Sequence, residues 1–153
     1  MTERPAESGF TLLETICVLA VIAMLAAIVL PAIPHATSRT ALEAYALKTA
    51  ALLKSDRNAA IRNGSTVQTE LNKSSGTIRS GASGQVLQLP GDVTFNAIVA
   101  TQCGGHANGP AIEFLPSGMS CGGTIFLSRP GTGFEVRITW LTGGIEVVPA
   151  NAL

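Results

Sequence analysis

The sequence predicts an α+β protein in which a long N-terminal helix, apolar in its first half and amphipathic in its second, packs on an antiparallel β-rich domain. Three observations lead to this fold class. An unbroken apolar run extends from Ile16 to Leu30, apolar residues then recur at three- and four-residue spacing up to Asn63, and short alternating segments separated by Gly and Pro follow. A helix followed by consecutive strands is the order typical of α+β proteins.

The first element is the apolar run. Ile16–Leu30 alone is short for a membrane span, but Phe10–Leu13 and Ala32-Ile33 extend it. At 1.5 Å per residue, a helix over residues 10–33 is about 36 Å long, and it crosses a hydrocarbon core of about 30 Å with some tilt. We therefore expect a transmembrane helix over residues 10–33, kinked near its end at Pro31.

A carboxylate lies inside this apolar segment, at Glu14. A charged side chain in a spanning helix costs roughly 2.5–3.5 kcal/mol, so such a residue is by default a functional one with a partner. Glu14 needs a cation. A free amine four residues upstream, created by cleavage between Gly9 and Phe10, would supply one on a neighbouring copy.

Two other interpretations of the N-terminus stay open. A secretory signal peptide has a basic first region and a cleavage site of small residues, which Ala26-Ala27 mimics. Residues 1–8, however, contain two glutamates and one arginine, and this interpretation does not explain Glu14. The other alternative is an ordinary signal anchor that contains a glutamate by chance.

The second element is an amphipathic helix, expected over residues 34–64 as a continuation of the first. Thr37 or Ser38 is suited to cap a helix start, and Asn63-Gly64 to end it. The residues that share the apolar stripe are Leu42, Tyr45, Ala46, Thr49, Leu52, Leu53, Asp56, Ala59 and Ala60. We expect this stripe to pack onto a sheet.

Residues 65–153 are expected to form the β-rich domain, with one antiparallel sheet or two small ones. Alternation over Phe134–Trp140 places Trp140 on the buried face of its strand. The segments with strand character are Thr66–Leu71, Gln85–Leu89, Val93–Val99, Ile112–Leu115, Thr124–Ser128, Phe134–Trp140 and Ile145–Val148.

Composition limits the range of functions. The 153 residues suffice for one anchor and one small domain. Ten basic and ten acidic residues give a formal net charge of zero, which does not favour nucleic acid as a partner.

The cysteines indicate an oxidising compartment. Cys103 and Cys121 each precede a pair of glycines, and a disulfide between them closes a loop of about 18 residues, which the chain-entropy model values at about 3 kcal/mol. Such a bond requires a compartment like the periplasm. Two free thiols near turns are the alternative. Cys17 lies in the apolar run, where it reads as a small lipid-facing or helix-packing residue.

No catalytic or metal site is expected. The sequence has no Gly-x-Ser-x-Gly segment, no phosphate-binding glycine loop and no Cys-x-x-Cys pair. His35 and His106 are far apart, and the carboxylates are scattered. We therefore expect no enzyme, no catalytic residue, no metal and no cofactor.

The N-terminus resembles a known processing signal. Gly9-Phe10-Thr11-Leu12-Leu13-Glu14 before a long apolar run is similar to the class III signal of type IV pilins and type II secretion pseudopilins. The resemblance implies that residues 1–9 are a leader, that a prepilin peptidase cuts after Gly9 and methylates Phe10, that Glu14 is the assembly carboxylate, and that Pro31 is the kink proline.

The distal part resembles one class within this family, the H class of type II secretion minor pseudopilins, whose domain is shared with minor type IV pilins of the FimT kind. The matching segments are Asp56–Arg62, Ile112–Gly118, Gly122–Ile125, Val136–Ile138 and Thr142–Ile145.

The resemblance implies a minor pseudopilin that helps to drive protein export across the outer membrane. It would be a single-pass inner-membrane protein, with its N-terminus cytoplasmic and its C-terminal domain periplasmic, that assembles into the periplasmic pseudopilus. Its implied partners are the prepilin peptidase, other major and minor pseudopilins, the inner-membrane assembly platform and the membrane, without nucleic acid. A minor type IV pilin in pilus assembly, adhesion or DNA uptake is one alternative, and a signal-anchored periplasmic protein unrelated to filaments is another.

Overall fold

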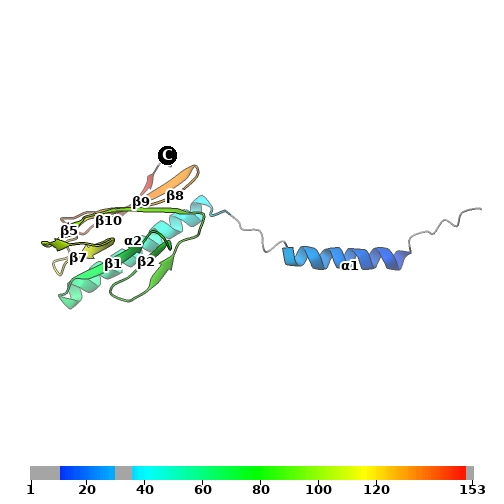
Figure 1. Cartoon of the computed structure of the whole chain (residues 1–153), viewed down its shortest axis with the longest axis horizontal. Helices are drawn as coiled ribbons and strands as arrows, with labels where there is room; N and C mark the ends of the chain where they lie inside the picture. Colours follow the sequence, from blue (N-terminus) through cyan, green and yellow to red (C-terminus); the bar gives the residue numbers. More distant parts are fainter. Residues whose placement is uncertain (1–10, 30–35, 151–153) are drawn as a thin grey trace, which may run out of the picture. The chain divides into compact units, whose positions relative to one another are not determined.

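The computed structural model describes residues 11–29 and 36–150 (Figure 1). The chain divides into two compact units between Ala36 and Thr37. The first contains helix α1 (Leu12–Val29), and the second contains helix α2 (Arg39–Asn63) and all the strands. Three residues with expected roles, Gly9, Phe10 and Pro31, lie outside the described residues.

Helix α1 begins at a local cap. The backbone N–H of Glu14 donates to the carbonyl of Thr11 at 3.0 Å and to its hydroxyl at 3.3 Å. Thr11 is therefore the N-cap residue of α1. Glu14 is the acidic residue of the first turn, and the last turn has no basic residue. No helix among the described residues combines the length and the apolarity expected of a membrane span.

Helix α2 has a defined residue at each end. Ser38 is extended, and its hydroxyl accepts a hydrogen bond from the backbone N–H of Ala41 at 3.1 Å. Gly64 ends the helix in the left-handed conformation with φ 62°, where a glycine avoids Cβ strain. The helix therefore begins directly after Ser38, one of the two caps expected from the sequence, and ends before Gly64, the expected stop.

The strands form two four-stranded antiparallel sheets, in the orders β3-β2-β1-β7 and β10-β9-β8-β4, and a small hairpin, β5-β6. This confirms the α+β fold class. The strands are β1 (Val67–Asn72), β2 (Thr77–Arg79), β3 (Val86–Gln88), β4 (Thr94–Val99), β5 (Gln102–Cys103), β6 (His106–Ala107), β7 (Ala111–Phe114), β8 (Gly123–Arg129), β9 (Thr132–Ile138) and β10 (Ile145–Ala150).

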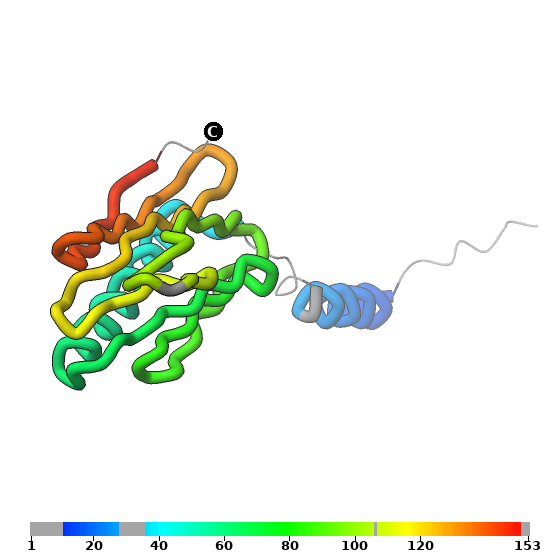
Figure 2. The backbone as a smooth tube through the Cα atoms, turned by 60° about the vertical axis from the view of Figure 1, so that its left-hand side comes forward, coloured from blue at the N-terminus to red at the C-terminus, as the bar shows by residue number. Residues whose placement is uncertain are grey.

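Helix α2 supports both sheets. It contacts β1 and β7 of one sheet and β8, β9 and β10 of the other, and it runs along them in both views (Figures 1 and 2). The buried stripe of α2 and the inner faces of the strands share one core, in which Leu42, Leu53, Ile112, Phe114 and Val136 are inaccessible to solvent.

A buried carboxylate lies within this packed face of α2. Asp56 is inaccessible to solvent and accepts hydrogen bonds from the hydroxyl of Thr69 on β1, at 2.6 Å, and from the hydroxyl of Ser80 after β2. The backbone N–H groups of Gly81 and Ala82 also point to it, at 3.3 and 3.4 Å. Asp56 thus connects the helix to the strand beside it and to the loop before β3.

The structure differs from the sequence-based prediction at three places. Strand β2 and the β5-β6 hairpin were not expected, because two- and three-residue strands among turn residues leave no periodic pattern. Trp140 was expected on the buried face of its strand but is 63% exposed. Strand β9 ends at Ile138, where the chain turns and the backbone N–H of Gly143 donates to the carbonyl of Thr139 at 2.8 Å.

We predict that Asp56→Ala lowers the free energy of unfolding by about 3 kcal/mol, because it leaves buried hydroxyl and backbone donors without an acceptor. Urea denaturation of the full chain in mild detergent, followed by circular dichroism, measures this change. Lys54→Ala, at an exposed position half a turn away, is the control and should change stability by less than about 0.5 kcal/mol. A loss below about 1 kcal/mol for Asp56→Ala would contradict the assigned role.

Candidate functional site

The first candidate site is the exposed surface of α1. Leu12, Leu19 and Met24 are 77%, 65% and 71% exposed, and no described residue of α1 is buried. An apolar surface of this kind is stable only when lipid or another protein covers it.

Glu14 adds a charge to this apolar surface. It lies in the first turn of α1, where the partial positive charge of the helix N-terminus favours an anion. Among residues 11–29 and 36–150, the one ion pair that forms joins Arg137 to Glu135, and Glu14 takes no part in it. The amine expected to pair with Glu14, that of Phe10, lies outside the described residues.

The second candidate site lies at the C-terminal half of α2. The guanidinium of Arg57 donates from Nε to the carbonyl of Gly118 at 2.9 Å and from Nη2 to the carbonyl of Thr142 at 3.0 Å. It thereby ties the β7–β8 loop and the β9–β10 loop to the helix. These three segments resemble the H class separately in the sequence, and the structure brings them together.

Gly143 is required for this junction. Its φ is +61°, and a Cβ at this position would lie 2.1 Å from the carbonyl oxygen of Gly118 and 2.8 Å from Nε of Arg57. Any larger residue would separate the two loops or displace the arginine. The Thr-Gly-Gly segment therefore serves close packing here as well as the turn.

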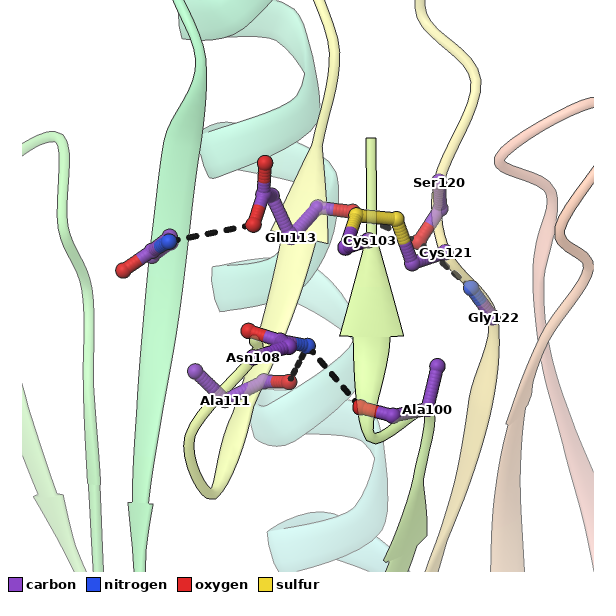
Figure 3. Close-up of a disulfide and its surroundings, with 9 residues drawn as sticks. Ala100, Cys103, Asn108, Ala111, Glu113, Ser120, Cys121 and Gly122 are labelled. Carbon is purple, nitrogen blue, oxygen red and sulfur yellow. Dashed lines mark hydrogen bonds between the residues drawn. A yellow bond between two sulfur atoms is a disulfide. The ribbon is translucent and has the colours of Figure 1, made fainter. Parts of the chain in front are cut away.

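A disulfide holds the same end of the domain. Cys103 and Cys121 are bonded, with their Cα atoms 5.6 Å apart, so the cysteines form the disulfide and not the free-thiol alternative (Figure 3). The bond ties the β5-β6 hairpin to the segment that leads into β8. Asn108 holds the other side of the hairpin, since its Nδ2 donates to the carbonyls of Ala100 and Ala111 at 3.2 and 3.1 Å (Figure 3). Among the described cysteines, Cys17 alone is free, and it is exposed.

A polar contact fixes the start of the second unit. The backbone N–H of Thr37 donates to Asp92 at 2.6 Å, and the hydroxyl of Thr37 donates to the other carboxylate oxygen at 2.7 Å. Both bonds lower the pKa of Asp92 below its ordinary value, and the backbone bond has the larger effect. Desolvation by burial raises this pKa, but by less than the two bonds lower it. The sequence suggests Thr37 only as a helix cap. The contact with Asp92 could not be predicted from local sequence patterns, because the two residues are 55 positions apart.

No metal centre forms in the part of the chain that the structure covers, because no three His, Cys, Asp or Glu side chains come together there.

Comparison with known proteins gives two kinds of match. Residues 4–30 match the family model described as "Prokaryotic N-terminal methylation motif". No curated protein sequence matches the chain significantly.

Among solved structures, the minor pseudopilin EpsH from the type 2 secretion system of Vibrio cholerae is similar, with a TM-score of 0.57 and 12% identity over 70% of this chain and 95% of that one. A second structure of EpsH gives a TM-score of 0.55 with 12% identity, over 71% of this chain and 94% of that one. The type IV minor pilin FimU of Pseudomonas aeruginosa gives a TM-score of 0.54 with 17% identity, over 74% of this chain and 92% of that one.

The chain thus carries the N-terminal methylation motif of type IV pilin-like proteins and has a pilin-like α+β fold. The structures that it resembles are those of pilin and pseudopilin subunits, not of enzymes. Type IV pilin-like proteins are anchored in the membrane by an N-terminal segment, with the soluble domain outside. The motif implies a substrate of a prepilin peptidase with pilin-like filament partners.

We predict that Asp92 stabilises the fold at neutral pH and loses this effect in acid. Because its pKa in the folded chain is below the ordinary value of 3.8, its contribution is fully present above about pH 4 and disappears as pH falls through the lowered pKa. Urea denaturation of wild type and Asp92→Asn should show a less stable variant at pH 7 and a smaller difference at pH 3. Equal differences at both pH values would contradict this role.

Proposed function

We propose that this chain is a minor pseudopilin, a structural subunit of the type II secretion pseudopilus that helps to drive protein export across the outer membrane. One observation carries the proposal. Glu14 stands without a described cation in the first turn of an exposed apolar helix, within the methylation motif and ahead of a pilin-like domain.

In this proposal, processing creates the partner of Glu14. Residues 10–33 anchor the chain in the inner membrane, with the leader cytoplasmic and the β-rich domain periplasmic. The prepilin peptidase cuts after Gly9 and methylates the new amine of Phe10. That amine, on one subunit, pairs with Glu14 of the next.

The helices then leave the lipid and pack together in the filament. Each helix exchanges its contacts with lipid for contacts with other helices. The free energy of assembly therefore comes from close packing and polar pairing, not from the removal of apolar surface from water. The Glu14–amine pair fixes the axial register, because removal of either member leaves a buried charge unpaired.

The segments that resemble the H class support the secretion role, and the likeness to EpsH agrees with it at the level of the fold. The similar TM-score for FimU favours a second candidate, a minor type IV pilin in pilus assembly, adhesion or DNA uptake. Deletion of the gene separates the two, since the first function predicts loss of exported proteins with pili unchanged and the second predicts the reverse.

We predict that Glu14→Ala abolishes incorporation into the filament while leader removal persists. The amine of the neighbouring subunit would remain buried without an anion, at a cost of about 3–5 kcal/mol. Sheared filaments from the native host, probed for this chain, measure incorporation, and the gel mobility of the membrane-bound chain reports processing.

Cys17→Ala is the matched control for Glu14→Ala. Cys17 is an uncharged, exposed residue about one turn further along α1, so this variant should enter the filament normally. Normal incorporation of Glu14→Ala into the filament would contradict the proposed pairing of Glu14 with the amine of the next subunit.

A further inference from the structure

A groove lies between the C-terminal half of α2 and the β9–β10 loop. Its volume is about 300 Å³, and its lining residues are Lys54, Arg57, Asn58, Gly143, Gly144 and Ile145. The groove is next to the Arg57 junction, so its walls are fixed by the hydrogen bonds from Arg57 to the two loops.

Cationic and amide side chains lie at the mostly apolar lining of the groove. Arg57 employs Nε and Nη2 in the junction, which leaves Nη1 for a ligand. Within the described ranges, the ammonium of Lys54 and the side-chain amide of Asn58 make no hydrogen bond or ion pair. Two cations and an amide at one groove match a carboxylate.

No acidic residue of the surrounding loops neutralises these cations. Residues 115–122 and 139–144 contain no Asp or Glu. Asp56 and Glu146 are the carboxylates next to groove residues in sequence. Asp56 is buried and accepts hydrogen bonds from Thr69 and Ser80. Glu146 stands opposite Arg137 on β9. The described loops around the groove therefore supply no anion to it.

The loop beside the groove exposes apolar surface. Trp140 and Leu141 are 63% and 56% exposed. The backbone of Trp140 is nevertheless fixed, because its carbonyl accepts a hydrogen bond from the N–H of Ser120 at 3.0 Å, next to the disulfide-bonded Cys121. An exposed tryptophan on a fixed backbone is typical of the centre of a protein interface.

We propose that this groove binds a carboxylate side chain of a neighbouring, unlike filament subunit, and that Trp140 and Leu141 cover apolar surface around that carboxylate. This inference rests on the proposed function, because the partner is a neighbour in the filament.

A minor subunit has unlike neighbours under the proposed function, so the carboxylate is assigned to one of them and a second copy is an outcome of the test. Among the described carboxylates of this chain, Glu135 forms an ion pair with Arg137 at 2.7 Å. Nucleic acid is disfavoured, because it needs an extended row of cations and the chain has no net charge.

Carbodiimide cross-linking of the full chain in native membranes tests this contact. The reagent joins an amine directly to a carboxylate that touches it and inserts no spacer. We expect Lys54 to be joined to an Asp or Glu of another filament subunit, identified by peptide mass spectrometry.

Lys54→Gln should remove this product, whereas Lys48→Gln should keep it. Lys48 is the matched control because it lies on the same helix, 5.3 Å from the ring centroid of Tyr45, and does not line the groove. Trp140→Ala should reduce the yield by about tenfold or more with an unchanged circular dichroism spectrum, because Trp140 is exposed.

Three outcomes would overturn the inference. Cross-links from Lys48 or Lys73 to filament subunits without one from Lys54 would show assembly without the groove, so the proposed function would stand. Cross-links of Lys54 to a second copy, or retention of a DNA oligonucleotide that Lys54→Gln abolishes, would show a different occupant. Loss of every cross-link to filament subunits would contradict the proposed function together with this inference.

Discussion

The rest of the structure depends on one constraint, the exposed apolar surface of α1 with a carboxylate in its first turn. An apolar helix needs lipid or protein around it, and a carboxylate in such surroundings needs a cation. One step satisfies both needs, namely assembly next to a subunit whose processed N-terminus supplies a positive charge. A carboxylate near the N-terminal end of α1 is well placed for that contact.

The second unit is organised by polar groups of α2 that lie side by side. Asp56 binds β1 and the loop before β3, and Arg57 binds the β7–β8 and β9–β10 loops. Consecutive residues of one helix therefore hold a strand and three loops of the second unit, and the disulfide joins the β5-β6 hairpin to the segment before β8. A groove on such a support keeps its shape, which a binding surface requires.

Much of this structure follows from local sequence patterns. Ser38 and Gly64 mark the two ends of α2, because a hydroxyl cap and a left-handed glycine act within a few residues. The alternation of apolar residues in β4 and β9 indicates that each strand has one buried face. The cysteines next to glycine pairs indicated their bond. These signals are readable because each cause lies close to its effect in the chain.

The remaining features depend on partners that are distant in sequence. The bonds of Thr37 to Asp92 and of Arg57 to Thr142 span 55 and 85 residues, so no local pattern shows them. The position of Asp56 on the buried side of α2 follows from the sequence, because this residue lies on the mostly apolar stripe. Trp140 continued the alternation of its strand, and only the turn after Ile138 explains its exposure.

The mass of the intact protein, extracted from the membranes of its native host, tests the central claim most directly. The account predicts a chain that begins at Phe10 and carries one additional methyl group, so that a positive terminus exists to meet Glu14. A chain that still begins at Met1 would contradict it.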